Sequence, residues 1–215
     1  MFITFEGIDF SGKSTQISLL RQRLEEMGHD TLVVREPGGT VISEHIRALL
    51  LDPSFVHMDP VSEFLLFSAS RSQLVREVIR PALNRGTLVI ADRFFDSSTA
   101  YQGYGRGLEL EDLLRVHHLA IHGSMPDLTI FLDIPVAESF ARRAQRAGDI
   151  DRMERADEAF YNRVRDGYLQ IAAAAQERFL LLDGERPQED IAEDIWEIVG
   201  TKLSPPDNSH EGGTT

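Results

Sequence analysis

Residues 7–14 have the types and spacing of a loop that binds phosphate. They read Gly-Ile-Asp-Phe-Ser-Gly-Lys-Ser, which matches the pattern G-x-x-x-x-G-K-[ST] between an apolar run and an amphipathic helical pattern. Glycines let successive backbone N–H groups of such a loop face phosphate oxygens, and the following helix presents its positive end. Lys13 would reach the β and γ phosphates, and the Ser14 hydroxyl would bind Mg²⁺. Because motif and context agree, an ordinary strand-to-helix turn is the weaker interpretation, and we predict ATP or GTP binding.

Two absences narrow the class of nucleotide-binding protein. Guanine-specific proteins usually carry Asn-Lys-x-Asp, and neither Lys13 nor Lys202 lies in such a run. Motor and transport ATPases usually follow an apolar strand with Asp-Glu, whereas here residues 88–91 lead into Asp92-Arg93, which supplies no glutamate to activate water. A kinase is therefore favoured, with Ser14 and Asp92 as the metal contacts. The predicted nucleotide contacts are Gly7, Ile8, Asp9, Phe10, Ser11, Gly12, Lys13, Ser14 and Thr15.

Arginine is the default cation of this chain, since 20 of its 22 basic residues are arginines. Phosphoryl transfer brings two anions together, so its catalysis is mostly positioning and neutralisation of charge. Arg93 directly follows an apolar run, at the end of a strand where ligands of a parallel sheet bind, so we predict that it contacts a ligand. The alternative is that it only forms an ion pair at the surface. Seven arginines fall within residues 142–165. The alternative interpretation is an ordinary solvent-exposed helix in which acidic residues are interleaved with the arginines. Gly148 interrupts the helical pattern, so we predict a mobile, arginine-rich lid over 142–156.

Asp9 is unexpected in a phosphate cradle, because its carboxylate would be repelled by the ligand. We expect it to point elsewhere, towards a hydroxyl, or to act only as a local turn former.

Five short apolar runs supply the scaffold for these groups. None alternates with polar residues, as expected of strands covered on both faces. Helical patterns lie between them, so the βα alternation predicts an α/β fold with a doubly wound, five-stranded parallel sheet and helices on both faces. The predicted strands are 2–5, 32–34, 88–91, 128–132 and 179–182, and the predicted helices are 14–27, 41–51, 60–84, 110–122, 136–145, 157–177 and 187–199.

Composition limits the class of partner. The chain of 215 residues is 42% hydrophobic, enough for one core, and its net charge of −13 disfavours nucleic acid and anionic membrane as partners. The absence of cysteine suits a reducing compartment, and we expect a soluble, cytoplasmic protein. Residues 1–203 are predicted to form one domain, and 204–215, which hold no apolar residue, a disordered tail.

Several segments in order along the chain resemble the bacterial thymidylate kinase (dTMP kinase) family, whose members have a P-loop nucleoside monophosphate kinase fold. The segment after the second strand is the most specific, and the match runs from about residue 1 to 200. The segments are Phe5-Glu6-Gly7-Ile8-Asp9, Arg35-Glu36-Pro37-Gly38-Gly39-Thr40, Asp92-Arg93-Phe94, Ala100-Tyr101-Gln102-Gly103 and Gly148-Asp149-Ile150-Asp151-Arg152-Met153-Glu154.

The resemblance implies a role for each matching residue. Asp9 would face the 3′-hydroxyl of the deoxyribose, and Tyr101 would lie against the 2′ carbon. Phe67 would stack on thymine and Arg71 would read the base edge, although Phe67 alone would pass for a core residue. Further members of the implied acceptor site are Ser98 near the pyrimidine, Gln102 behind it, and Arg93 and Arg47 on the acceptor phosphate.

The sequence departs from some family members at Phe10, where they carry an arginine in the phosphate loop. The resemblance then implies that the lid supplies the catalytic guanidinium. Arg146 is the first candidate, followed by Arg143 and Arg152.

The resulting hypothesis is a magnesium-dependent kinase that transfers the γ-phosphoryl group of ATP to dTMP by direct in-line displacement, giving dTDP for dTTP synthesis. The resemblance also implies a homodimer. A nucleoside kinase of similar fold and a regulatory ATP-binding switch are the alternatives.

Overall fold

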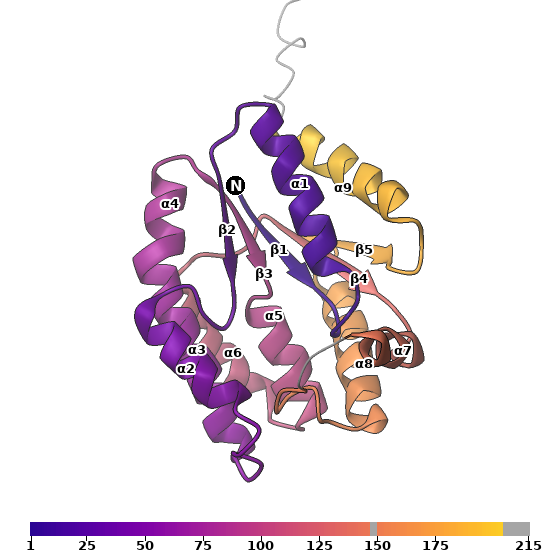
Figure 1. Cartoon of the computed structure of the whole chain (residues 1–215). Helices are drawn as coiled ribbons and strands as arrows, with labels where there is room; N and C mark the ends of the chain where they lie inside the picture. Colours follow the sequence, from indigo (N-terminus) through magenta and orange to yellow (C-terminus); the bar gives the residue numbers. More distant parts are fainter. Residues whose placement is uncertain (147–149, 204–215) are drawn as a thin grey trace, which may run out of the picture.

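The computed structural model describes residues 1–146 and 150–203. Residues 147–149 of the predicted lid and the predicted tail 204–215 lie outside the described residues. Within the described part, five strands form a parallel sheet, as predicted, and their order is β2-β3-β1-β4-β5 (Figure 1). The strands are β1 Phe2–Glu6, β2 Thr31–Arg35, β3 Leu88–Asp92, β4 Leu128–Asp133 and β5 Phe179–Asp183.

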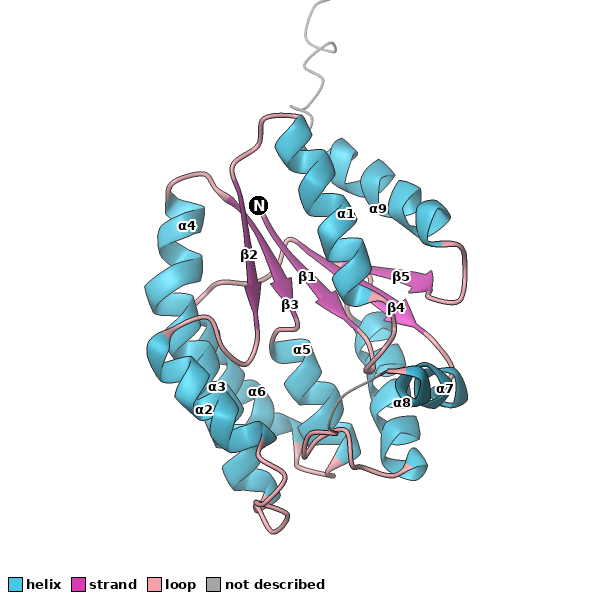
Figure 2. Cartoon of the chain, in the orientation of Figure 1, coloured by secondary structure: helices cyan, strands magenta, loops and turns pink. Residues whose placement is uncertain are grey.

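Helices cover both faces of this sheet (Figure 2). On one face lie α1 and α9, and on the other lie α3, α4, α6 and α8, while α2 packs on α3 and α7 packs on α8. The bounds are α1 Lys13–Glu26, α2 Val41–Leu51, α3 Pro60–Leu74, α4 Arg80–Asn84, α5 Phe95–Ser98, α6 Leu110–Ile121, α7 Val136–Gln145, α8 Glu158–Ala174 and α9 Gln188–Leu203. Among the described residues, no helix is both long and apolar enough to cross a membrane.

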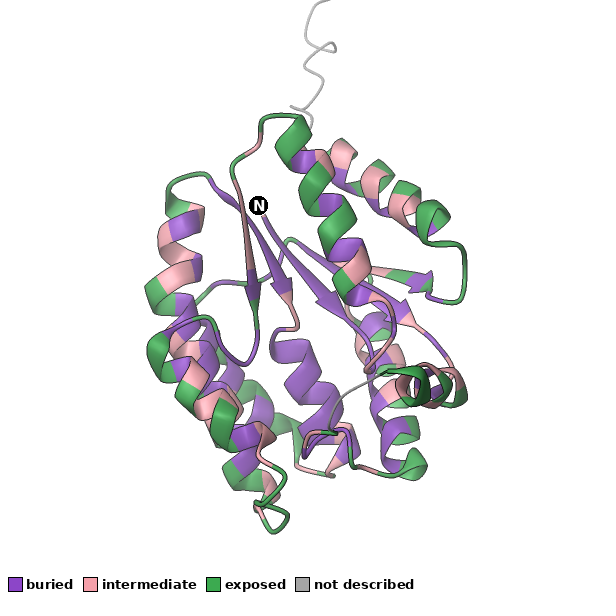
Figure 3. Ribbon diagram, in the orientation of Figure 1, coloured by how far each residue is buried: buried purple, intermediate pink, exposed green. Residues whose placement is uncertain are grey.

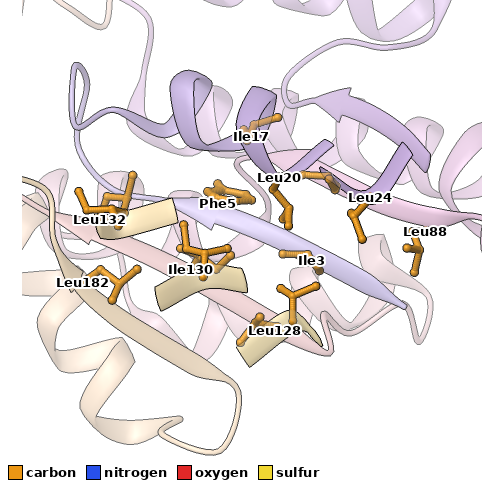
Figure 4. Close-up of a cluster of buried hydrophobic side chains, with 14 residues drawn as sticks. Ile3, Phe5, Ile17, Leu20, Leu24, Leu88, Leu128, Ile130, Leu132 and Leu182 are labelled. Carbon is orange, nitrogen blue, oxygen red and sulfur yellow. The ribbon is translucent and has the colours of Figure 1, made fainter. Parts of the chain in front are cut away.

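The central strands β1, β3 and β4 are buried on both sides, which explains why their sequences do not alternate, whereas the edge strands β2 and β5 are partly exposed (Figure 3). Ile3 and Phe5 pack beneath α1 and α9, whereas Phe2 faces the opposite helices. The cluster under α1 and α9 includes Ile17, Leu20, Leu24, Ile90, Leu128, Ile130, Leu132, Ile191 and Ile195 (Figure 4). Burial of an aliphatic side chain of this size contributes about 1.5–3 kcal/mol, so this cluster stabilises the sheet that carries the loops.

Gly7 is required where β1 turns into the phosphate loop. Its φ is 140°, and a Cβ atom there would lie 2.5 Å from the carbonyl oxygen of Leu132 on β4. The loop can therefore approach the neighbouring strand only with glycine at this position.

The structure differs from the sequence prediction in two helical regions. The predicted helix 60–84 is α3 and α4 joined by a π-helical segment, η1 Val75–Ile79. Pro81 follows this segment; it has no N–H to donate, and its ring would clash with a carbonyl of a regular helix. A second, unpredicted stretch consists of α5 and a π-helical segment, η2 Thr99–Gly105. Because nearly every residue from 95 to 105 is buried, this stretch has no amphipathic period to detect.

Candidate active site

A cleft of about 800 Å³ opens at the carboxyl ends of the strands. It brings together the phosphate loop, the ends of β2 and β3, α7 and the segment between β5 and α9. Predicted residues that line it are Asp9, Phe10, Ser11, Gly12, Lys13, Ser14, Thr15, Arg47, Asp92, Arg93 and Arg146. Gly7 and Ile8 are not among the lining residues, but their carbonyls hold the lysine of the loop.

Lys13 is folded back over the phosphate loop. Its buried Nζ donates to the carbonyls of Ile8 at 2.9 Å and Gly7 at 3.2 Å. Burial, and then repulsion from Arg93, lowers the pKa of Lys13 to about 8. Asp92, Asp9 and Glu6 offset part of this effect, and an incoming polyphosphate would add further counter-charge.

Arg93 lies between the phosphate loop and the pocket behind it. Its backbone has a φ of 70°, a left-handed conformation that costs a residue other than glycine about 1–3 kcal/mol. The Nη1 atom donates to the carbonyl of Gly7 at 2.8 Å, and the guanidinium carbon lies 5.1 Å from the ring centroid of Tyr101.

Asp9 is a partner of Arg93 rather than a simple turn former. Its Oδ1 atom accepts from Arg93 Nη2 at 2.6 Å, and its Oδ2 atom accepts from the hydroxyls of Tyr161 at 2.7 Å and Tyr101 at 3.4 Å. Burial raises the pKa of Asp9, but Arg93 and then Lys13 outweigh it, so the pKa lies below its ordinary value. The carboxylate is therefore charged at neutral pH and offsets two neighbouring cations.

A second, smaller pocket of about 120 Å³ adjoins this cleft. Asp9, Arg47 and Arg93 line both cavities. The small pocket is also lined by Phe67, Arg71, Ser98, Tyr101 and Gln102, the residues that the resemblance assigns to an acceptor nucleotide. Phe67 is only partly buried and faces this pocket, so the core interpretation does not describe it.

Arg71 is held rigidly at the wall of the small pocket. It forms an ion pair with Glu36, and its Nη2 atom donates to Ser98 Oγ at 2.7 Å. Its Nη1 atom lies 3.2 Å from His117 Nδ1. Burial, and then Arg71, lowers the pKa of His117 to about 2, so the neutral ring accepts from Arg71 and donates its Nε2–H to Thr99. Within the described chain, Arg71 Nε has no hydrogen-bond partner.

The three candidate lid arginines have different surroundings. Arg146 lines the large cleft, pairs with Glu154 at 2.9 Å, and has its guanidinium carbon 5.8 Å from the ring centroid of Phe10. Arg143 lines neither cavity: it donates to the carbonyl of Glu154 and lies over Phe140 at 4.1 Å.

Arg152 also lies outside the linings of both cavities. It is buried, and its Nη1 atom pairs with Glu63 at 2.6 Å, while its Nε atom donates to the carbonyl of Leu50 at 2.7 Å. Gln102 and Arg106 also donate to Glu63. Arg152 therefore anchors residues 150–156 to α3 and lies away from the phosphate loop.

Three cleft arginines were missed by sequence reasoning: Arg35, Arg142 and Arg186. Arg35 lies at the end of β2 and pairs with Glu44 at 2.9 Å. Arg142 donates to the carbonyls of Phe10 at 3.2 Å and Gly184 at 3.3 Å, and Arg186 lines the cleft after β5. Arg186 could have been found, because ligands of a parallel sheet bind beyond the carboxyl ends of its strands. Arg142 could not be separated from its neighbours by spacing alone.

Comparison with known proteins gives one consistent result. A profile of the thymidylate kinase family matches residues 5–195. The thymidylate kinase of Deinococcus radiodurans is 48% identical over 202 residues, covering 94% of this chain and 97% of that protein. The thymidylate kinase of Halothermothrix orenii is 48% identical over 201 residues, covering 93% and 96%. The crystal structure of thymidylate kinase from Ehrlichia chaffeensis has a TM-score of 0.75 and 35% identity, covering 93% of this chain and 98% of that one. The chain therefore belongs to the thymidylate kinase family.

Proposed function

We propose that this protein phosphorylates dTMP to dTDP with ATP as the phosphoryl donor. The observation that carries the proposal is the meeting of the two cavities at Arg93, Asp9 and Arg47. One cavity contains the phosphate loop, which suits ATP. The other has a half-buried aromatic ring and a fixed guanidinium, which suit a base.

The reaction requires no covalent enzyme intermediate. A phosphate oxygen of dTMP attacks the γ-phosphorus of ATP, a new P–O bond forms, and the bond to the bridging oxygen of ADP breaks in line with it. The attacking oxygen is already anionic, so no strong general base is needed. Lys13 and Arg146 hold the phosphates of the donor, and Arg93 with Arg47 holds the phosphate of the acceptor.

The acceptor nucleoside occupies the small pocket. Phe67 stacks on thymine, and Arg71 and Ser98 face its polar edge. Tyr101 excludes a 2′-hydroxyl, and Asp9 accepts from the 3′-hydroxyl. Gln102 stays behind the base, where it donates to buried Glu63 at 2.9 Å. A base stacked on an aromatic ring gains about 1–3 kcal/mol.

We infer that Mg²⁺ is the metal cofactor. The Ser14 hydroxyl and the Asp92 carboxylate line the same cleft, and both are oxygen ligands of the kind that Mg²⁺ prefers. The described residues hold no cluster of three or more metal-binding side chains. This fits an ion that takes most of its ligands from phosphate and water, and when bound it would neutralise phosphate charge.

We further infer a cytoplasmic homodimer. The helices α2, α3 and α6 lie side by side (Figure 1), and they expose apolar side chains to solvent. Leu65 on α3 is 50% exposed and Leu114 on α6 is 56% exposed. A second copy of the chain would cover this face, because a patch of this kind marks an interface. A reducing compartment suits a chain without cysteine.

A coupled assay for ADP tests the proposed reaction. The purified protein receives ATP, Mg²⁺ and one acceptor at a time: dTMP, thymidine, dUMP or dCMP. We expect the highest kcat/KM with dTMP and little ADP without an acceptor. Equal turnover of thymidine would indicate a nucleoside kinase, and ADP release that no acceptor changes would indicate a regulatory ATP-binding switch.

A further inference from the structure

The left-handed backbone of Arg93 needs support from its surroundings. Arg93 directly follows β3, and the next residue, Phe94, is fully buried with its N–H outside the sheet ladder. A strained conformation of this kind persists only where neighbouring contacts hold it. The group that holds Phe94 is therefore in a position to control where the Arg93 guanidinium points.

Glu6 is that group. Its side chain is buried at the end of β1, and its Oε1 atom accepts from the backbone N–H of Phe94 at 2.8 Å. Its Oε2 atom accepts from the hydroxyls of Ser97 at 2.5 Å and Tyr168 at 3.0 Å. The carboxylate therefore accepts from the buried Phe94 N–H and from both hydroxyls, whose oxygens also lie 2.7 Å from each other.

The same two hydroxyls also contact Arg93. The Nη1 atom of Arg93 donates to Ser97 Oγ at 3.2 Å and to Tyr168 Oη at 3.2 Å. Each hydroxyl can donate its proton to Glu6 while accepting from Arg93. Glu6 thus holds the backbone of Phe94, just beyond Arg93. Through the two hydroxyls it also holds one edge of the Arg93 guanidinium. Glu6 itself lines neither cavity.

We propose that Glu6 is a positioning residue for phosphoryl transfer, which fixes the Arg93 guanidinium between the donor cleft and the acceptor pocket. The proposal rests on the proposed function, in which Arg93 holds the phosphate of dTMP. Glu6 acts through Arg93 and touches no substrate. Its removal should therefore affect dTMP and the transfer step while leaving the binding of ATP nearly unchanged.

Two substitutions at Glu6 separate geometry from charge. Glu6→Ala removes all three acceptor contacts, so we expect kcat/KM for dTMP to fall about 10- to 100-fold, as misplacement of a catalytic group by about 1 Å can do. Glu6→Gln can still accept from Phe94 and can donate to Ser97, so it should retain most of the activity. The KM for ATP should change little in either variant.

Asp96→Ala is the matched control. Asp96 is another buried acid of the same core, and it pairs with Arg178 at 2.7 and 2.8 Å. It forms no hydrogen bond with Arg93 or Glu6 and acts on Glu6 only through charge repulsion, so its loss leaves the three contacts of Glu6 in place. Asp96→Ala should lower the Tm as much as Glu6→Ala does. It should not lower kcat/KM for dTMP to a comparable extent. Steady-state kinetics for both substrates, with the Tm of each variant, supply the comparison.

A milder variant covers the case in which Glu6→Ala does not fold. Tyr168→Phe removes one hydroxyl bridge and keeps the ring that stacks on Phe131, with centroids 5.1 Å apart. We expect kcat/KM for dTMP to fall in this variant as well, by a smaller factor than in Glu6→Ala, while the KM for ATP changes little. Suppose that the native protein phosphorylates dTMP. Unchanged kinetics in Tyr168→Phe, or equal losses of kcat/KM for dTMP in Glu6→Ala and Asp96→Ala, would then overturn the role of Glu6 but not the proposed function. Failure of the native protein to phosphorylate dTMP would overturn both the assignment and the proposed function.

Discussion

Of the three candidate arginines in the predicted lid, only Arg146 lines the large cleft. Arg146→Ala should lower kcat by about 10³-fold, because an arginine that stabilises the transferring phosphoryl group contributes at least this much. The KM for dTMP should change little, since Arg146 does not line the acceptor pocket. Steady-state kinetics with dTMP varied at saturating ATP measure both quantities.

Arg152→Ala is the informative comparison for that experiment. Loss of Arg152 leaves buried Glu63 with fewer donors, so the variant should lose about 1–3 kcal/mol in free energy of unfolding. If Arg152→Ala abolished turnover while Arg146→Ala had no effect, the assignment of Arg146 to the transferring phosphoryl group would be wrong.

Tyr101 provides a test of sugar selection. Tyr101→Ala should raise kcat/KM for the ribonucleotide analogue of dTMP, relative to dTMP itself, by about 10-fold, because the ring no longer occupies the space of a 2′-hydroxyl. Tyr101→Phe keeps the ring and should keep the native preference. An unchanged ratio in Tyr101→Ala would refute the steric role.

At the scale of elements, the exposed faces of α3 and α6 make the dimer testable. Leu65→Asp places a charge in the proposed interface, so it should convert a dimer into a monomer in size-exclusion chromatography with light scattering. Met27→Asp, at a side chain that is 60% exposed beyond the end of α1, is the control and should stay dimeric. A native protein that elutes as a monomer would contradict the proposal.

The elements that carry the site differ in how well sequence predicts them. The five strands are predictable because buried parallel strands are short, unbroken apolar runs, and the residues at their ends, such as Arg93, follow from the geometry of the sheet. The stretch 95–105 has no such signature, because it is buried on all sides. Its residues Tyr101 and Gln102 could be assigned only through family resemblance.

Contacts between distant segments are the other part that sequence does not reveal. Glu63 and Arg152 are 89 positions apart, and the charge run around Arg152 gives no sign of this buried partner. Likewise Glu6 reads as the end of a strand, and its contact with Phe94 spans 88 positions. Such pairings depend on how α3, β3 and the predicted lid pack in three dimensions.

The whole molecule can be acidic and still bind anions, because many of its cationic side chains lie together in the large cleft. The chain has a net charge of −13. The lining of the large cleft nevertheless has more cations than acids: it holds Lys13, Arg35, Arg47, Arg93, Arg142, Arg146 and Arg186 against Asp9, Glu36, Asp92, Asp151 and Glu154. Local cations can therefore hold two phosphorylated ligands in a molecule that repels anions elsewhere.

Buried Glu6 also makes the stability of the whole fold depend on pH. Burial, and then repulsion from Asp96, raises the pKa of Glu6 to about 7. The folded chain thus binds this proton more tightly than the unfolded chain. The contribution of Glu6 to the free energy of unfolding should fall by up to about 3 kcal/mol as the pH rises from about 4.5 to 7, and stay constant above that.

Differences in Tm between Glu6→Gln and the native protein, measured from pH 4.5 to 8, test this dependence. Glu6→Gln has no titrating group, so its Tm relative to the native protein should rise up to about pH 7 and then level off. Glu26→Gln, on the exposed side of α1, should show no such trend. A Tm difference that is constant across the range for Glu6→Gln would contradict the raised pKa.

Cations at the meeting point of the two cavities should hold a donor and an acceptor that repel each other. Isothermal titration calorimetry with dTMP, after saturation of the cleft with a non-hydrolysable ATP analogue and Mg²⁺, measures this binding. We predict a clear heat of binding at one site per chain, with a strong loss of affinity in Arg93→Ala. The absence of binding heat in the native protein, or native affinity in Arg93→Ala, would contradict the claim.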